Sequence, residues 1–201
     1  MYAPQDRLVI SLRLGNVPLL EVAVAILLRK IRLTETSLIV TWLSQKHGRV
    51  KTVAKGARGQ KSRFAGTTDL FFQCDIQFTL SSKSDLHTLR EAALRDPFPG
   101  LRAEYGRLLL AGYFVELLEL VTEPEHPAPE MYDLLLRALK HLNEKAATAR
   151  AMEHFESELA RLLGIQQAGV SGANALARTY LQLPAARRKL AQHFAERSAE
   201  A

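Results

Sequence analysis

The sequence predicts an α+β fold, in which a small antiparallel β-barrel is followed by an all-helical domain. Three observations lead to this prediction. Short β-branched or alternating segments joined by tight loops fill residues 20–83. Apolar residues recur at helical spacing over 84–201. The run Pro97-Phe98-Pro99-Gly100 interrupts any element that would cross the change of pattern. We therefore expect two domains, preceded by an N-terminal extension at 1–19 to which we assign no function.

Four segments have the character of strands. Leu20–Leu28 is rich in Val, Ile and Leu, and Ser37–Leu43 is β-branched and aromatic. In Arg49–Lys55, small and apolar residues alternate with mostly cationic ones, which places the cations on one face. The clearest alternation is in Phe71–Leu80, where Cys74 falls on the apolar, core-facing side. We therefore expect Cys74 to be a small buried side chain rather than a reactive thiol.

The second half of the chain predicts helices. Ser84 fits the N-cap of a helix that runs to Arg95, so the helical domain is expected to begin at residue 84. Beyond the proline break, apolar residues at helical spacing predict further helices. These cover about 101–121, 131–142, 152–163, 173–183 and 185–199.

The composition excludes several classes of protein. The chain has 201 residues, of which 47% are hydrophobic, enough for a sizeable core. A single cysteine excludes an internal disulfide framework and a zinc site built from several cysteines. No apolar stretch reaches the roughly 20 residues that a membrane-spanning helix requires. We therefore expect a soluble, intracellular protein.

Positive charge is concentrated in one part of the chain. Lys and Arg number 27 against 21 Asp and Glu, a formal net charge of +6. No acidic residue lies between Glu35 and Asp69, and the seven cations of that interval exceed the net charge of the whole chain. They are Lys46, Arg49, Lys51, Lys55, Arg58, Lys61 and Arg63.

These seven cations are candidates for binding a phosphate backbone, because clustered cations attract a polyanion and release its counterions. Barrels that bind single strands combine a cationic groove with aromatic stacking. Trp42 and Phe64 could supply the aromatic part. The alternatives are a solvated basic surface that binds nothing in particular, and aromatic side chains that belong to the core.

No motif nominates a catalytic site. The run Gly56–Ser62 superficially matches a phosphate-binding P-loop, but Gln60 stands where that motif needs a glycine before Lys61. Gly56–Gly59 matches the GXXG loop of KH domains, but that loop should join two helices and here follows a strand. The six histidines are scattered without metal-site spacing. We therefore expect a protein that is not an enzyme and uses no cofactor.

Residues 25–66 resemble the N-terminal region of the RecO family of bacterial DNA repair and recombination mediator proteins. Residues 86–92 also resemble the family's link from barrel to helices, whereas the resemblance is vaguer over the helical half. Four short runs carry most of it: Glu35-Thr36-Ser37, His47-Gly48-Arg49-Val50, Val53-Ala54-Lys55-Gly56-Ala57-Arg58 and Lys61-Ser62-Arg63-Phe64.

The resemblance implies an OB-fold at residues 20–83 and a non-catalytic protein that binds single-stranded DNA and anneals complementary strands. Double-stranded DNA is a further candidate ligand. The implied partners are RecR and the C-terminal tail of single-stranded DNA-binding protein, and the implied role is to help load the RecA recombinase in the bacterial cytoplasm, at the nucleoid. The family's basic strand and loop fall on the cations from Arg49 to Arg63. The four-cysteine zinc site of many members cannot form here, and the helical half is short for the family.

A tail that ends in acidic residues and an aromatic needs an apolar pocket with a cationic rim. The candidate residues lie in the two helices expected after the proline break, and their alternative role is a solvated helix face. They are Arg102, Tyr105, Arg107, Arg137 and Lys140.

For the whole protein, the alternatives are an interaction adaptor whose basic patch binds an acidic protein, and a phosphate-ester enzyme that uses the Gly56–Ser62 loop.

Overall fold

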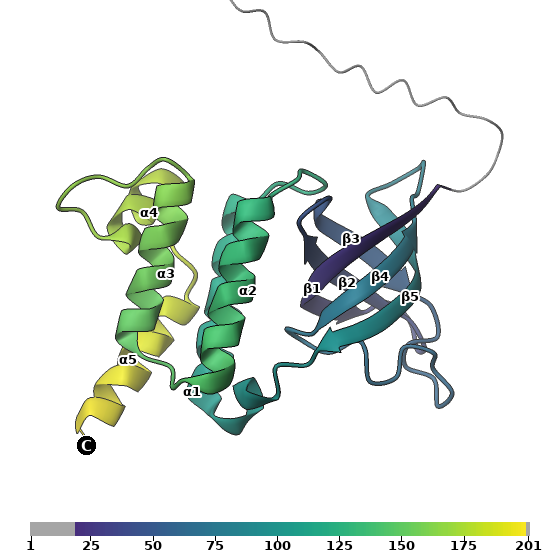
Figure 1. Ribbon diagram of the computed structural model, residues 1–201, viewed down its shortest axis with the longest axis horizontal. Helices are drawn as coiled ribbons and strands as arrows, with labels where there is room; N and C mark the ends of the chain where they lie inside the picture. Colours follow the sequence, from purple (N-terminus) through teal and green to yellow (C-terminus); the bar gives the residue numbers. More distant parts are fainter. Residues whose placement is uncertain (1–18, 200–201) are drawn as a thin grey trace, which may run out of the picture.

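A computed structural model describes residues 19–199 of the chain. A β-barrel and a helical domain stand side by side (Figure 1), which confirms the expected α+β class. Of the N-terminal extension expected at 1–19, all but Leu19 lies outside the described residues. The barrel consists of β1 (Leu20–Arg32), β2 (Leu38–Ser44), β3 (Gly48–Ala54), β4 (Gln73–Thr79) and β5 (Leu86–Asp96).

The five strands close on one another in the order β1-β2-β3-β5-β4. Neighbouring strands are antiparallel except for β3 and β5, which pair in parallel from Lys51 opposite Leu86. A bulge between Leu27 and Arg29 bends β1, so that one long strand pairs with both β2 and β4. This arrangement is the expected OB-fold-like barrel, and closure leaves it without an unpaired sheet edge.

Side-chain alternation fills the barrel interior. Trp42 is fully buried, and its indole Nε1 donates a hydrogen bond of 2.9 Å to the Thr52 hydroxyl on β3. Cys74 is also fully buried, and its thiol donates to the Thr67 carbonyl oxygen at 3.3 Å. Burial raises the pKa of the Cys74 thiol to about 12. The expectation that Cys74 is a small core side chain is therefore confirmed.

The helix expected from Ser84 to Arg95 is wrong, because this segment is β5. Ser84 shapes the turn before the strand, where its Oγ accepts a hydrogen bond from the Leu86 amide at 3.3 Å. His87 and Leu89 alternate into the core, and a register shift in the pairing with β4 then turns Ala92 inward. The barrel therefore extends through Asp96, beyond the boundary expected at residue 83.

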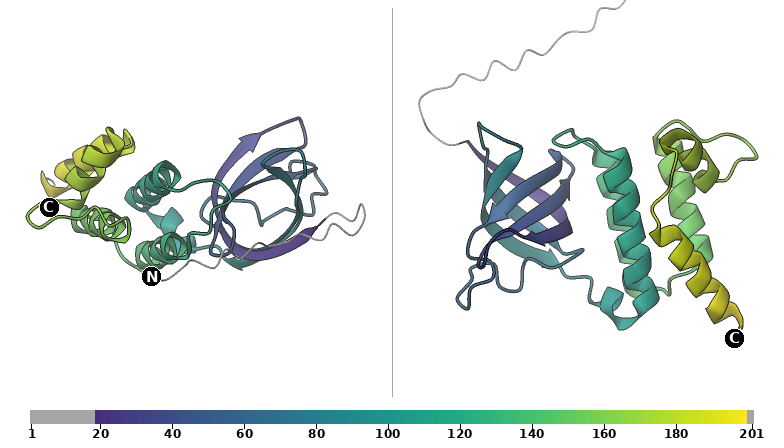
Figure 2. Two further views of the ribbon diagram at one scale, coloured as in Figure 1. Left: turned by 90° about the horizontal axis from the view of Figure 1, so that it is seen from above. Right: turned by 180° about the vertical axis from the view of Figure 1, so that it is seen from behind.

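The helical domain forms two layers beside the barrel. Helices α1 (Tyr105–Val121) and α2 (Pro129–Glu144) stand next to the barrel, and the remaining helices lie farther away (Figures 1 and 2). A short 3-10 helix, η1 (Pro99–Ala103), precedes α1. The outer layer contains α3 (Ala149–Leu162), α4 (Gly172–Tyr180) and α5 (Ala186–Ala199). None of the described helices has the length and apolar character needed to cross a bilayer.

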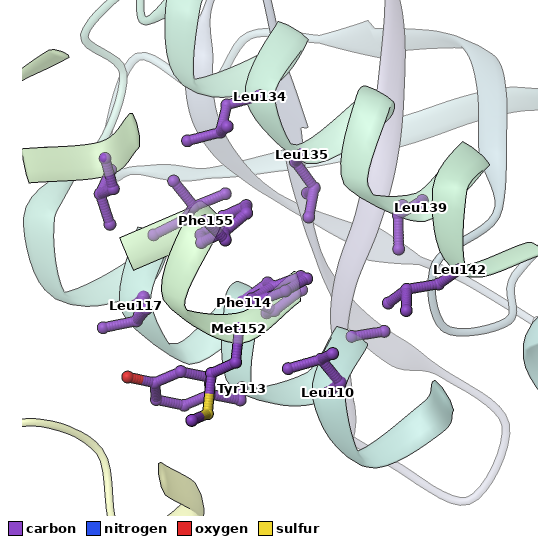
Figure 3. Packing of buried hydrophobic residues seen from close by; sticks show 14 of the residues in the cluster. Leu110, Tyr113, Phe114, Leu117, Leu134, Leu135, Leu139, Leu142, Met152 and Phe155 are labelled. Atoms are coloured by element: carbon purple, nitrogen blue, oxygen red, sulfur yellow. The ribbon is translucent and has the colours of Figure 1, made fainter. Parts of the chain in front are cut away.

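Aromatic and leucine side chains fill the space between the two helical layers (Figure 3). The rings of Phe114 on α1 and Phe155 on α3 are stacked, with centroids 3.9 Å apart. Ile26 and Leu43 point outward from the barrel into the same apolar cluster. The two domains therefore share a core.

The loop between α1 and α2 docks on the start of β3. Its Pro124 forms a bridge with Arg49, and the Glu125 amide donates to the Arg49 carbonyl oxygen at 2.9 Å. Gly48 has a φ of 61°, and a Cβ at this position would overlap the carbonyl oxygen of His126. Only glycine allows this close approach without strain.

Candidate nucleic-acid interface

Strand β3 carries its cations on the outside of the barrel, as its alternation predicts. Val50, Thr52 and Ala54 are buried inside, whereas Lys51 is exposed on the opposite face and Lys55 is exposed directly after the strand. The first part of the β3–β4 loop, which follows, projects at the end of the barrel away from the helices (Figure 1), whereas Asp69 and Phe71 near its end contact the helical domain. The end of β3 and this loop therefore belong to one surface.

The β3–β4 loop is held in place at two points. Phe64 is only 1% exposed and anchors the loop in the barrel core. Arg58 fastens the loop to the β1–β2 hairpin, because its amide donates to the Thr36 carbonyl oxygen at 2.9 Å and its guanidinium to that of Glu35 at 2.8 Å. The cations of the loop therefore have defined positions against the hairpin tip.

Four of the seven expected cations lie at this end of the barrel, and we call them the loop cations. Over residues 19–199, none of the four forms an ion pair with a carboxylate. Arg58 contacts backbone carbonyl oxygens, which leave its charge uncompensated, and the Arg63 guanidinium lies 4.9 Å from the centre of the Phe64 ring. The loop cations are the exposed residues Lys55, Arg58, Lys61 and Arg63.

The other three expected cations have partners within the protein. Lys46 forms a 2.9 Å ion pair with Glu21, and Lys51 forms a 3.1 Å pair with Asp85. The hydrogen bond from Lys51 lowers the pKa of the Asp85 carboxyl. Arg49 donates at 2.9 Å to the carbonyl oxygens of Glu119 and Thr122, so it joins the barrel to the end of α1. The seven cations therefore do not form one uniform surface.

The two aromatic side chains expected to stack on bases do not lie on the described barrel surface. Trp42 is 0% and Phe64 1% exposed, so both belong to the core, which was the alternative left open by the sequence. Phe71 and Phe78 are buried as well, and Phe72 is half-buried beneath the Arg102 guanidinium.

Sequence reasoning did not single out three exposed cations on β1. Each is paired with a carboxylate: Arg29 with Glu119, Lys30 with Asp69 and Arg32 with Glu35. They stand among apolar residues at the end of β1, a segment whose sequence looks like an ordinary strand. Their partners leave little net charge there.

The five residues expected to form a partner-tail pocket do not converge. Arg102 pairs with Asp69, and Arg107 donates to the carbonyl oxygens of Gly100 and Asn143. Tyr105 is 70% exposed beside His193. Lys140 is exposed on α2 and is not among the residues that line the cavity to which Arg137 belongs.

That cavity lies between α2 and α3 and has a volume of about 670 Å³. Phe114, Leu142 and Phe155 contribute apolar walls, and no carboxylate is among the described residues that line it (Figure 3). The basic side chains that line it come from both helices and the loop between them. They are Arg137, His141, Lys145, Arg150 and His154. An apolar pocket with a basic rim therefore exists, but at a different place from the one expected.

Comparison with known protein families gives matches over both domains. Residues 21–98 match the family model described as Recombination protein O N terminal, and residues 102–175 match Recombination protein O C terminal. The chain belongs to the RecO family. The N-terminal match ends just after β5, which agrees with a barrel that extends through Asp96.

Curated relatives carry the name DNA repair protein RecO. The relative from Rhodopirellula baltica is 36% identical over 140 residues, which are 70% of this chain and 52% of that protein. The relative from Salinibacter ruber is 33% identical over 145 residues, 72% of this chain and 56% of that protein. The chain thus spans about half the length of the curated RecO relatives it matches.

Proposed function

We propose that this chain is a non-enzymatic recombination mediator in DNA repair. In this proposal it binds single-stranded DNA, promotes annealing of complementary strands, and helps load a recombinase onto DNA coated with single-stranded DNA-binding protein. One observation carries the proposal: at one end of an OB-fold-like barrel, Lys55, Arg58, Lys61 and Arg63 are exposed and have no carboxylate partner among the residues that the structure describes. Such a protein would act in the bacterial cytoplasm, at the nucleoid.

The loop cations supply the chemistry that a phosphate backbone requires. Each can neutralise a phosphate and release a condensed counterion, so binding depends on salt and little on sequence. Arg58 and Arg63 have planar guanidinium groups that can form two hydrogen bonds to one phosphate. No covalent step is needed, because annealing requires only that repulsion between two strands be reduced.

The cavity between α2 and α3 supports an interaction with the C-terminal tail of single-stranded DNA-binding protein. Its apolar walls can take an aromatic side chain, and its rim of Arg137, Lys145 and Arg150 can pair with the acidic residues beside it. The cavity is lined by residues of the helical domain alone, whereas the loop cations belong to the barrel, so the two proposed ligands would use different surfaces. RecR remains a proposed partner from family membership, without an assigned surface.

The alternative function is an interaction adaptor whose loop cations bind an acidic protein. The exposure of these cations fits that function too. The two functions differ in their ligand, since an adaptor would bind an acidic protein in preference to an oligonucleotide of similar charge.

Band-shift and annealing assays with a loop variant test the proposal. The variant changes Lys55, Arg58, Lys61 and Arg63 to Ala, and its matched control removes four exposed helical cations, Lys140, Arg178, Arg188 and Lys189. We expect the loop variant to bind a single-stranded oligonucleotide at least about tenfold more weakly at low salt. It should also anneal complementary strands more slowly, while the control variant behaves as wild type.

Two outcomes would contradict the proposal. Wild-type affinity in the loop variant would mean that DNA, if bound, uses another surface. Failure of the wild-type protein to bind either single- or double-stranded DNA would favour the adaptor.

A further inference from the structure

We propose that the DNA bases contact a partly exposed aliphatic row on the outer face of β1, β2 and β3. The row consists of Ile31, Ile39 and Val53. This inference rests on the proposed function and adds to it the part of the surface that receives the bases rather than the phosphates.

Strand register brings the three side chains together. Ile31 lies opposite Ile39, and Ile39 lies opposite Val53, so the row crosses three adjacent strands. Ile31 is 52% exposed and the neighbouring Leu33 44% exposed, whereas Ile39 and Val53 are partly buried. Strands in a sheet are about 4.8 Å apart, so the row is roughly 10 Å wide. Large apolar side chains gathered on a surface usually mark a contact site.

Cations border the aliphatic row on two sides. Lys51, which pairs with Asp85, lies on the outer face of β3 with Val53, and the exposed Lys55 follows directly after the strand. Arg58 donates to the carbonyl oxygens of Thr34 and Glu35, which places its guanidinium at the tip of the hairpin that carries Ile31 and Ile39. A strand whose phosphates meet these cations would have its bases within reach of the aliphatic row.

The charge around the row favours DNA over a protein partner. Lys55 and Arg58 have no carboxylate partner within the described residues, so the row adjoins uncompensated positive charge. Cores of protein–protein interfaces are depleted of charged residues, and they are enriched in aromatic ones. On the described barrel no aromatic side chain is exposed.

Aliphatic contacts suit a protein that anneals strands. Proteins that store single strands stack bases on aromatic rings, at about 1–3 kcal/mol per base. Isoleucine and valine offer apolar contact without a flat ring, so each base is held less tightly. The base edges then remain available to pair with an incoming complementary strand.

A tryptophan reporter tests the position of the bases. Trp42 is the single tryptophan and is fully buried, so Ile31→Trp adds one exposed indole against a constant background. Val22→Trp is the matched control, since Val22 is 55% exposed on the same strand, opposite Gln77 of β4. We expect single-stranded DNA to quench the new fluorescence of Ile31→Trp and to leave that of Val22→Trp unchanged. Quenching of both variants alike, or of neither, would overturn the inference.

A polar double variant tests the energetic contribution of the row. Ile31→Ser with Ile39→Ser should bind a normal single strand roughly fivefold more weakly than wild type, because apolar contact with the bases is lost. Its affinity for an abasic strand of equal length should match wild type, because the phosphate contacts remain. Equal affinity of variant and wild type for both strands would overturn the inference.

These results separate the inference from the proposed function. If the loop variant loses DNA binding while the row variants bind normally and Ile31→Trp is not quenched, only the inference fails, and the row becomes a candidate protein contact. If wild-type protein binds no DNA, both fail together.

Discussion

At the scale of single residues, cationic side chains in and directly after β3 serve two different purposes. Arg49 donates to two carbonyl oxygens at the end of α1, where those groups lack helical partners. Lys55, the residue after the end of β3, is exposed and forms no ion pair within residues 19–199. Arg49 therefore acts in joining the two domains, and Lys55 is available to a ligand.

Substitution by alanine should separate these two purposes. We expect Arg49→Ala to lower the free energy of unfolding by about 2 kcal/mol, because two partly buried carbonyl oxygens lose charged donors. Lys55→Ala should change stability by less than about 0.5 kcal/mol and weaken binding of single-stranded DNA. Urea unfolding and band-shift titration measure the two effects. An Arg49→Ala protein with wild-type stability and weakened DNA binding would reverse the assignment.

At the scale of elements, two histidines close the end of the barrel that faces the α1–α2 loop. His47 lies edge-on to Phe78, and the His87 ring stacks on the other side of Phe78. The Ser81 amide donates to His87 Nδ1 at 3.2 Å, and Glu125 from the α1–α2 loop lies 3.1 Å from His87 Nε2. Histidine side chains therefore lie beside the α1–α2 loop, through which the helical domain contacts the barrel.

Acid should destabilise this end of the barrel through His47. Burial lowers the pKa of His47, and Lys46 and His87 add to this, although Glu21 opposes it. Between the lowered folded pKa and the unfolded value of about 6.5, the unfolded chain binds more protons, so stability falls as pH drops below about 6.5. We expect the unfolding temperature of wild type to fall more between pH 7.5 and 5.5 than that of His47→Gln.

An exposed histidine provides the control for this experiment. His154→Gln should keep the pH dependence of wild type. If His47→Gln and wild type lose stability equally on acidification, then His47 contributes nothing to the acid response.

The elements also differ in how far sequence could predict them. The faces of β3 and β4 follow from a period of two, which is a local property, so the burial of Cys74 was predictable. β5 was not, because Leu86, Leu89 and Ala93 also fit helical spacing. It is a strand because it pairs with β3 on one side and with β4 on the other, and so closes the barrel. Pairing across the barrel overrides local preference there.

At the scale of the whole molecule, charge pairing decides which cations remain for a ligand. The run between Glu35 and Asp69 was predicted as one surface because no carboxylate is near it in the sequence. In the fold, Glu21 and Asp85 reach Lys46 and Lys51 from outside that run. The cavity between α2 and α3 was missed for a related reason, since three of its five basic residues lie beyond residue 144. Long-range pairing of this kind has no local sequence pattern.

The salt dependence of single-strand binding tests the central claim most directly. The logarithm of the association constant should fall with the logarithm of salt concentration, by about 0.7 per phosphate neutralised. Replacing Lys55, Arg58, Lys61 and Arg63 with Ala should flatten this slope by roughly three units. The control lacking Lys140, Arg178, Arg188 and Lys189 should keep the wild-type slope. An unchanged slope in the loop variant would show that these cations do not contact the DNA backbone.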